Sequence, residues 1–219
     1  MKEYKGIKAF LFDFDGTVAD TLKAIRITME LTAEKMGFPV DVEKAYAMAG
    51  SPVVAIGERI YGKENAEKFF KIYSEINSKY ILDLSTVFEG MEDILTDIRE
   101  HNKKAALVTS RTRKSLDVLL DHFKIRDYFD VLCTKESTEK HKPEPDPVLF
   151  ALKELGLKAN DAVMIGDTYD DVTSGTNAGT ATIGVSWGIS GREKLKILAH
   201  PDFLADSPEE LMQIIKSMY

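Results

Sequence analysis

Five short apolar runs recur along the chain, and polar or turn-favouring residues bound each of them. The runs contain few polar residues and do not alternate, which is typical of strands in a parallel sheet that is covered on both faces. Helical patterns separate the later runs. This alternation of strand and helix predicts an α/β fold with a doubly wound, parallel, Rossmann-like sheet. The predicted strands are Ile7–Phe12, Ala105–Val108, Val131–Cys133, Ala162–Ile165 and Ala181–Val185.

Apolar residues at helical spacing predict three helices among the later strands. A further helix is expected near residue 208, where Ser207 is a suitable N-cap residue and Pro208 suits the first helical position. The three apolar stripes are Ile94, Leu95 and Ile98; Leu116, Leu119, Leu120 and Phe123; and Val148, Leu149, Leu152 and Leu155.

Roughly ninety residues separate the first and second predicted strands, far more than a single crossover helix needs. Apolar residues spaced three and four apart between Leu22 and Met36 predict a helix that ends at Gly37. Further helical patterns follow without any strand signal. We therefore expect a helical cap domain, residues 18–83, inserted into a core domain of residues 1–17 and 84–219. The further cap helices are predicted over Val42–Ala49, from Pro52 toward Tyr61, and from Ala66 to Tyr80.

The composition is that of an ordinary globular protein, and it limits the partners. Of the 219 residues, 44% are hydrophobic and 30% are charged, and the net charge is −7. An acidic chain without a long basic run is not expected to bind nucleic acid or an anionic membrane. Neither a signal-peptide pattern nor a run of about 18 apolar residues occurs, so a cytoplasmic location is expected. The single cysteine, Cys133, is expected to be a buried thiol, and both a monomer and a dimer stay open.

Polar residues follow four of the predicted strands. Asp13 and Asp15 end the first apolar run, although burial of an unpaired carboxylate is strongly unfavourable. In sheets of this type, ligands bind at the carboxyl ends of the strands, near the point where the strand order reverses. We therefore expect one site at the rim of the sheet, provided that the first strand and the strand before Asp167 are neighbours. The other groups are Thr109-Ser110, Lys142 in Lys-Pro-Glu-Pro, and Asp167 with Asp170 and Asp171.

This set of side chains suits phosphoryl transfer to a carboxylate. An aspartate can attack phosphorus and form an acyl phosphate, which water then cleaves. Mg²⁺ prefers oxygen ligands, and a lysine, hydroxyl groups and backbone N–H groups can stabilise the transferring oxygens. Asp15, two residues from Asp13, can act as general acid and base. Each group alone also fits a turn, a helix cap or a surface lysine, but their coincidence at four strand ends favours a site.

The four groups resemble the motifs of the haloacid dehalogenase-like hydrolase superfamily, in its phosphatase branch. Asp-Phe-Asp-Gly-Thr, Val-Thr-Ser, Lys-Pro-Glu-Pro and Gly-Asp-Thr-Tyr-Asp-Asp occur in the family's order within residues 7 to about 188. The inserted helices resemble that family's helical cap. Stretches such as Val185-Ser-Trp-Gly and His200-Pro-Asp-Phe resemble the phosphoglycolate phosphatase and pyrophosphatase subgroup. The resemblance implies an Mg²⁺-dependent phosphatase that acts on a small phosphorylated substrate through an aspartyl phosphate.

The resemblance also implies a role for each matching residue. Asp13 would be the nucleophile and a metal ligand, and Asp15 the general acid and base with its backbone carbonyl on the metal. Asp167 would be a further ligand of Mg²⁺, with Asp171 as its support. The neighbouring Asp170 leaves open which of the two acids supports the metal. The implied phosphate-binding groups are the Thr109 hydroxyl, the Lys142 ammonium and the backbone N–H groups of Phe14, Gly16 and Ser110, with Thr17 of the phosphatase pattern beside them.

The cap is expected to set the choice of substrate, because its loops would close over the site and exclude water. The turn at Ala49–Pro52 is the candidate specificity loop. Four cationic residues are candidates for contacting a second anionic group of the substrate, although an exposed, solvated side chain is expected for each. They are Arg59, Lys79, Arg111 and Arg113.

Three other functions are weighed against a phosphatase. A sugar-phosphate mutase on the same scaffold would need its phosphoenzyme to resist water. A receiver-like signalling domain would have little use for Asp15 as an acid or for an insert of about 65 residues. A metal-independent dehalogenase would not need Asp15 or Asp167. The substrate stays open among phosphoglycolate, pyrophosphate and other small phosphates, because cap loops vary without altering the fold.

Overall fold

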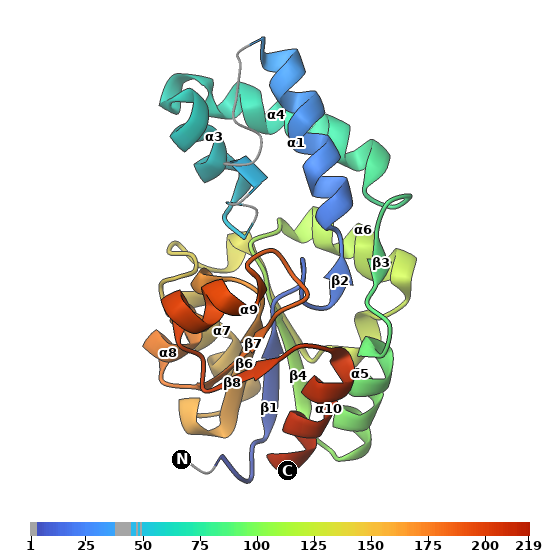
Figure 1. Ribbon diagram of the computed structural model, residues 1–219, viewed down its shortest axis with the longest axis vertical. Coiled ribbons are helices and arrows are strands. Elements are labelled where there is room, and N and C mark those ends of the chain that lie inside the picture. Colours follow the sequence, from blue (N-terminus) through green and yellow to red (C-terminus); the bar gives the residue numbers. More distant parts are fainter. Residues whose placement is uncertain (1–3, 38–44, 47, 49) are drawn as a thin grey trace.

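A parallel sheet forms the centre of the larger of two units (Figure 1). The computed structural model describes residues 4–37, 45, 46, 48 and 50–219. Within them the sheet has six parallel strands in the order β5-β4-β1-β6-β7-β8. The chain builds outward from β1 to β5 and then returns to β6 on the other side of β1, so the strand order reverses there. The strands are β1 (Ala9–Phe12), β4 (Lys104–Val108), β5 (Val131–Cys133), β6 (Ala162–Gly166), β7 (Ala181–Val185) and β8 (Phe203–Ala205).

The five strands predicted from the sequence are all present, and the predicted fold class is confirmed. β1 begins at Ala9 instead of Ile7, and β4 and β6 are each one residue longer than expected. β8 escapes the sequence pattern, because its three residues form a short, partly buried strand at the edge of the sheet. The turn before β8 is fixed by Asp202, whose carboxylate accepts hydrogen bonds from the N–H and the hydroxyl of Thr182 on β7.

Helices cover both faces of the sheet, and the alternation along β1 shows how. Ala9 and Leu11 pack into the apolar cluster beneath α7 and α8, whereas Phe10 and Phe12 pack with α5, α6 and α10. All four side chains are fully buried, and burial of a Leu or Phe side chain stabilises a fold by about 1.5–3 kcal/mol. The helices are α5 (Met91–Glu100), α6 (Arg113–Phe123), α7 (Asp146–Leu155), α8 (Tyr169–Ala178), α9 (Gly191–Lys194) with a π-helical turn (Leu195–Ala199), α10 (Pro208–Ser217), and 3-10 turns at Arg126–Tyr128, Lys135–Ser137 and Ala159–Asp161.

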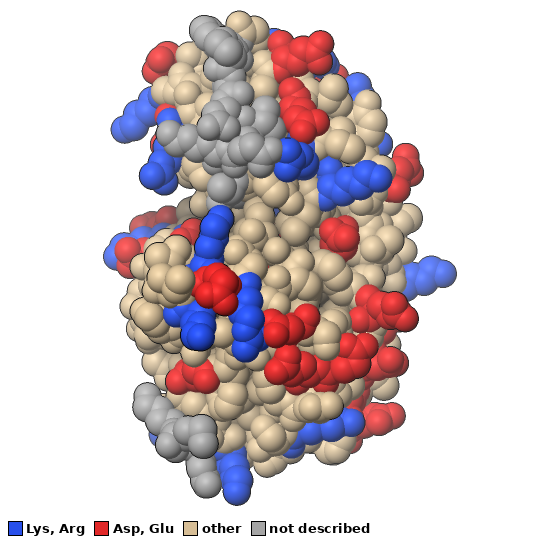
Figure 2. Space-filling model, viewed as in Figure 1, with Lys and Arg blue, Asp and Glu red and all other residues tan. Residues whose placement is uncertain are grey.

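The last helix begins where the sequence indicates. The Ser207 hydroxyl accepts a hydrogen bond from the N–H of Glu210, and Pro208 occupies the first turn of α10. Both α5 and α10 carry two acidic residues in the first turn, and acidic side chains gather over this part of the core in Figure 2. Carboxylates at these positions interact favourably with the helix dipole. Across the part of the chain that the structure describes, none of the helices has both the length and the apolar character that a bilayer crossing requires.

The second unit is a helical cap, joined to the core by two chain crossings (Figure 1). At the crossings, β2 (Ala19–Asp20) and β3 (Thr86–Val87) form an antiparallel ribbon. Among the described residues, the predicted cap segment, residues 18–83, contains the three helices named below, and Gly37 ends the first with a left-handed φ of 74°, as expected. The helix predicted over Val42–Ala49 falls mostly outside the described residues. The cap helices are α1 (Leu22–Met36), α3 (Val53–Tyr61) and α4 (Lys63–Tyr80).

The cap has an apolar cluster of its own, separate from the clusters of the core. Ile25 and Met29 of α1 pack with Ile56 of α3 and Phe69 of α4. Helices α3 and α4 approach closely at Gly57, where a Cβ atom would lie 2.7 Å from the Phe69 ring. Because this cluster is buried within the cap, the cap helices keep their own packing independent of the sheet.

Candidate active site

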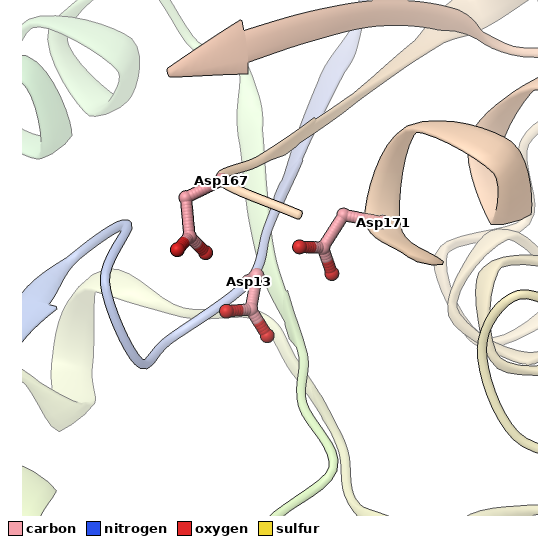
Figure 3. A group of neighbouring side chains, drawn as sticks. All are labelled: Asp13, Asp167 and Asp171. Carbon is pink, nitrogen blue, oxygen red and sulfur yellow. The ribbon is translucent and has the colours of Figure 1, made fainter. Parts of the chain in front are cut away.

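β1 and β6 bring two carboxylates to the same rim of the sheet. Asp13 follows β1 and Asp167 follows β6, and in these paired strands Phe12 lies opposite Ile165. Asp171, in the first turn of α8, completes the group (Figure 3). One carboxylate oxygen from each residue lies within 4.8 Å of the others. The expectation that Asp167 joins Asp13 across neighbouring strands is therefore confirmed, and the group lies where the strand order reverses.

Lys142 reaches the same group from the segment that follows β5. Its Nζ atom donates hydrogen bonds to Asp13 Oδ1 at 2.6 Å, to Asp171 Oδ1 at 2.5 Å and to the Val108 carbonyl at 3.0 Å. Only 3% of the side chain is exposed. Burial alone would lower the pKa of Lys142, but Asp13 and Asp171 together raise it well above its usual value. Lys142 is therefore a fixed ammonium that orients both carboxylates.

Negative charge exceeds positive charge at this site. Burial is the largest influence on Asp13 and, although Lys142 opposes it, the pKa of Asp13 rises to about 7, with Asp171 and Asp15 adding to the increase. Burial and the charges of Asp171 and Asp13 also raise the pKa of Asp167 well above its usual value. A set of three converging carboxylates with one ammonium fits a divalent cation that prefers oxygen ligands, such as Mg²⁺.

Asp15 lies beside this group but has a different partner. Arg111 holds its carboxylate with two parallel hydrogen bonds, from Nε to Oδ2 at 2.7 Å and from Nη2 to Oδ1 at 2.6 Å. The Thr21 hydroxyl also donates to Asp15 Oδ1. The side chains of Arg111 and Asp15 are only 10% and 15% exposed. The expectation of a solvated Arg111 is therefore wrong, because the fold brings the start of the β4–α6 loop against the loop that follows β1.

A comparison with models of protein families identifies the family of this chain. Residues 10–185 match the family model described as haloacid dehalogenase-like hydrolase. The chain belongs to this family. The match runs from within β1 to the end of β7 and includes all the residues of the acidic group, so the family and the hydrolase class expected from the motifs are confirmed.

Curated relatives and solved structures agree with this assignment. A protein of Caldanaerobacter subterraneus subsp. tengcongensis, provisionally named pyrophosphatase PpaX, is 36% identical over 96% of this chain and 95% of its own length. Pyrophosphatase PpaX of Bacillus cereus is 30% identical over 97% of this chain and 98% of its own. The crystal structure of a predicted phosphatase from Clostridium acetobutylicum is 25% identical, with a TM-score of 0.87 over 97% of this chain and 99% of that one. The whole hydrolase, cap included, is therefore similar to these proteins.

The loop that follows β7 fixes the position of Asp167, although the sequence did not assign this loop to the site. The N–H of Ile189 donates to Asp167 Oδ2 at 2.7 Å. A Cβ atom on Gly188 would lie 2.2 Å from that oxygen, and one on Gly16 2.5 Å from it. Only glycine permits this approach, and Gly16 also has a φ of 81°. The stretch Val185-Ser-Trp-Gly indicated only a resemblance to the phosphoglycolate phosphatase and pyrophosphatase subgroup. None of its residue types predicts a contact with Asp167.

The structure separates the two adjacent acids of α8. Asp171 is buried, and its Oδ2 accepts hydrogen bonds from the N–H of Thr168 at 3.0 Å and from its hydroxyl at 2.6 Å. Asp170 lies outside the acidic group and interacts with Ser51 of the cap, while burial raises its pKa. Asp171 is therefore the acid that the fold places beside Asp13 and Asp167.

The predicted phosphate-binding residues have distinct surroundings. Thr109 is buried, and its hydroxyl accepts a hydrogen bond from the N–H of Arg111. The alternative that Thr109 and Ser110 cap the next helix is wrong, because Thr112 caps α6. The hydroxyl of Ser110 donates instead to the carbonyl of Gly50 in the cap, at 2.8 Å.

The loop that follows β1 closes on itself and on Asp167. The N–H of Gly16 donates to the carbonyl of Ala19 at 2.9 Å within the loop, and its role as a phosphate donor, which the resemblance implies, stays a prediction. Thr17 is fully buried, and its hydroxyl donates to Asp167 at 3.3 Å. Phe14 is buried beside them. Gly16 and Thr17 therefore shape the loop around Asp167.

Proposed function

We propose that this hydrolase is an Mg²⁺-dependent phosphatase that cleaves a small phosphorylated substrate through an aspartyl phosphate on Asp13. The observation that carries the proposal is the position of Asp13. Its carboxylate ends β1 at the rim of the sheet, 2.6 Å from the Lys142 ammonium and grouped with Asp167 and Asp171. Relatives named pyrophosphatase make pyrophosphate the first substrate to test, ahead of phosphoglycolate. The cytoplasmic location expected from the sequence is part of this proposal.

In the proposed reaction, each residue of the site has its own role. An oxygen of Asp13 attacks phosphorus, the bond from phosphorus to the leaving oxygen breaks, and Asp15 gives that oxygen a proton. Water then attacks phosphorus and gives a proton to Asp15, the bond from phosphorus to the Asp13 oxygen breaks, and inorganic phosphate leaves, so that Asp13 and Asp15 are both restored. Lys142 holds Asp13 in place, and its positive charge would stabilise the negative charge of the phosphate oxygens. Mg²⁺, held by Asp13 and Asp167 with Asp171 beside them, would offset the negative charge of the carboxylates and the phosphate.

The decisive variant is Asp13→Asn, which keeps the size of the side chain and removes the nucleophile. We expect wild-type protein with Mg²⁺ to release phosphate from pyrophosphate and from p-nitrophenyl phosphate, and the variant to be slower by at least about 1,000-fold. Excess EDTA should abolish the wild-type activity, and added Mg²⁺ should restore it. Because Asn relieves the repulsion among the carboxylates, the variant should remain folded, which a thermal melt checks.

Two results would contradict the proposal. One is full activity of the Asp13→Asn variant, and the other is undiminished turnover without metal. The alternatives have their own signatures. A mutase would isomerise a sugar phosphate with little free phosphate, and a receiver-like domain would hold its acyl phosphate for a long time instead of turning it over.

A further inference from the structure

Arg111 is a buried cation at the junction of the cap and the core. Besides its two bonds to Asp15, its Nη1 atom donates to the Ser115 hydroxyl at 2.8 Å. Its guanidinium lies 6.0 Å from the centre of the Phe14 ring. Burial alone would lower the pKa of Arg111, but the Asp15 carboxylate raises it above its usual value. The guanidinium is therefore held in one place and stays charged.

Arg111 and Asp15 line a cavity between the two units. The cavity has a volume of about 530 Å³ and is bounded on the cap side by α4, with Tyr73 among its residues, and by Ser51 of the candidate specificity loop. Two further cations, Lys114 and Lys135, line its wall. The charged groups that face it are Arg111, Lys114 and Lys135 against Asp15 and Glu75.

If the Asp15 carboxylate leaves Arg111, the positive charge of the guanidinium is no longer offset and faces the cavity. With the ion pair intact, Asp15 occupies the edge of the guanidinium that Nε and Nη2 form, and the Ser115 hydroxyl accepts from Nη1. A guanidinium binds a phosphate in the same two-point geometry as a carboxylate. A phosphate that entered the cavity could therefore replace Asp15 on Arg111, with Lys114 and Lys135 nearby to stabilise its charge.

We propose that Arg111 selects substrates whose leaving portion carries a second anionic group, by exchanging the Asp15 carboxylate for that group. This inference rests on the proposed function, in which Asp15 serves the leaving oxygen. The exchange places the second phosphate of pyrophosphate on Arg111 and frees the Asp15 carboxyl next to the oxygen that it serves. A substrate with an uncharged leaving portion leaves Asp15 on Arg111 and gains nothing from the guanidinium.

The cap contacts the core next to Arg111. Ser110, the preceding residue, is hydrogen-bonded to Gly50 of the cap, and Lys135 lies 5.6 Å from the centre of the Phe70 ring of α4. Arg111 is therefore a core residue that faces the cap-side wall of the cavity. This position is suited to contact the part of a substrate that extends from the rim of the sheet toward the cap.

The test compares two substrates in three variants. Arg111→Ala and Arg111→Gln should lower kcat/KM for pyrophosphate by about 100-fold, mainly through KM, because a charge-assisted two-point contact is lost. For p-nitrophenyl phosphate, whose leaving portion is uncharged, kcat/KM should fall only through the disturbed position of Asp15, so the loss should be at least about tenfold smaller than for pyrophosphate. Arg111→Lys should recover part of the loss for pyrophosphate, because it keeps the charge without the fork. Arg113→Ala is the matched control, since Arg113 is exposed and pairs with Asp117 on its own helix.

Binding gives a second measurement that does not depend on turnover. Titration calorimetry with methylenediphosphonate, a non-cleavable analogue of pyrophosphate, should show about 100-fold weaker binding to Arg111→Ala than to the wild type. Binding of inorganic phosphate should change by less than about fivefold. Thermal melts of every variant establish that the chain is folded.

Two outcomes would overturn the inference. One is a parallel loss for both substrates, which would make Arg111 a structural partner of Asp15 only. The other is unchanged selectivity and unchanged affinity for the analogue. These outcomes are distinct from a failure of the proposed function, which appears in the wild type and in Asp13→Asn and does not depend on Arg111.

Discussion

At the scale of single residues, the site depends on which of several similar carboxylates the fold brings together. Asp13, Asp15, Asp170 and Asp171 are all acidic residues in short loops or helix ends, yet only Asp13 and Asp171 share the Lys142 ammonium. Asp15 is paired with Arg111, and Asp170 lies near the cap. The same side chain therefore has three different roles according to its neighbours.

The contrast between Asp171 and Asp170 can be tested directly. Asp171→Asn removes one charge from the acidic group and weakens the bond to Lys142, so kcat should fall by about 10- to 100-fold and more Mg²⁺ should be needed. Asp170→Asn is the matched control and should stay within about threefold of the wild type, as substitutions outside such networks do. Mg²⁺ titrations of phosphatase activity provide the measurement. Equal losses in the two variants would contradict the assignment.

At the scale of elements, the loops at the carboxyl ends of the strands fix the site more than the strands do. The loop after β7 reaches back to Asp167, and the loop after β1 closes on the same residue from the other side. The indole N–H of Trp187 donates to the carbonyl of Thr17 at 3.3 Å and so ties these two loops together. A change in either loop therefore acts on a carboxylate that lies far from it in the sequence.

Gly188→Ala tests the contact between the loop after β7 and Asp167. The new Cβ would lie 2.2 Å from Asp167 Oδ2, so the loop or the carboxylate must move, and overpacking of this kind costs about 1–3 kcal/mol. We expect activity to fall by about 10- to 100-fold, with weaker apparent Mg²⁺ affinity. Gly191→Ala is the control, because nothing lies within 4 Å of its Cβ and its φ of 68° makes it a test of backbone strain alone. A similar loss of activity in both variants would show that general disturbance of this loop, and not the contact with Asp167, is the cause.

At the scale of the whole molecule, the end of the described chain is tied to the core next to β1. Asp97 on α5 accepts a hydrogen bond from the Tyr219 hydroxyl at 2.7 Å and pairs with Lys216 of α10 at 3.0 Å. The ring of Tyr219 packs edge-on against Phe10 of β1, with 6.0 Å between the ring centres. These contacts hold α10 against α5 on the face opposite α7 and α8.

The Asp97 contacts predict how stability depends on pH. Burial alone would raise the pKa of Asp97, but the bonds from Tyr219 and Lys216 lower it below its usual value. The unfolded chain then binds the proton more tightly, so this contribution is present above about pH 4 and is lost as the pH falls through the folded pKa. Asp97→Asn should lower the free energy of unfolding by about 1–2 kcal/mol at pH 7, and the difference should shrink below about pH 4.

Urea denaturation at pH 7 and pH 3 measures the effect. Glu154→Gln is a suitable control, since Glu154 is an exposed residue of α7 and its change should stay within about 0.5 kcal/mol at both values. A loss of the same size at pH 3 and pH 7 in Asp97→Asn would contradict an electrostatic origin.

The sequence by itself determined the elements and the chemistry that they carry. The apolar runs located five strands, because strands buried on both faces must be continuously apolar. Helical spacing located α1, α3 and α4, and Ser207 and Gly37 marked helix ends. The acidic, hydroxyl and lysine residues after the strands indicated a phosphate and metal chemistry, because those residue types suit little else in such numbers at one rim.

Tertiary structure alone decided which of these residues meet. Strand order put β6 beside β1, and with it Asp167 beside Asp13, which no local pattern encodes. It also turned Arg111 from an expected surface cation into the partner of Asp15, and brought Gly188 and Ile189 onto Asp167. β8 was not predicted from its own three residues, because its place in the sheet depends on its pairing with β7. Local sequence sets the period and the ends of each element, whereas contacts between distant residues depend on how the elements pack together.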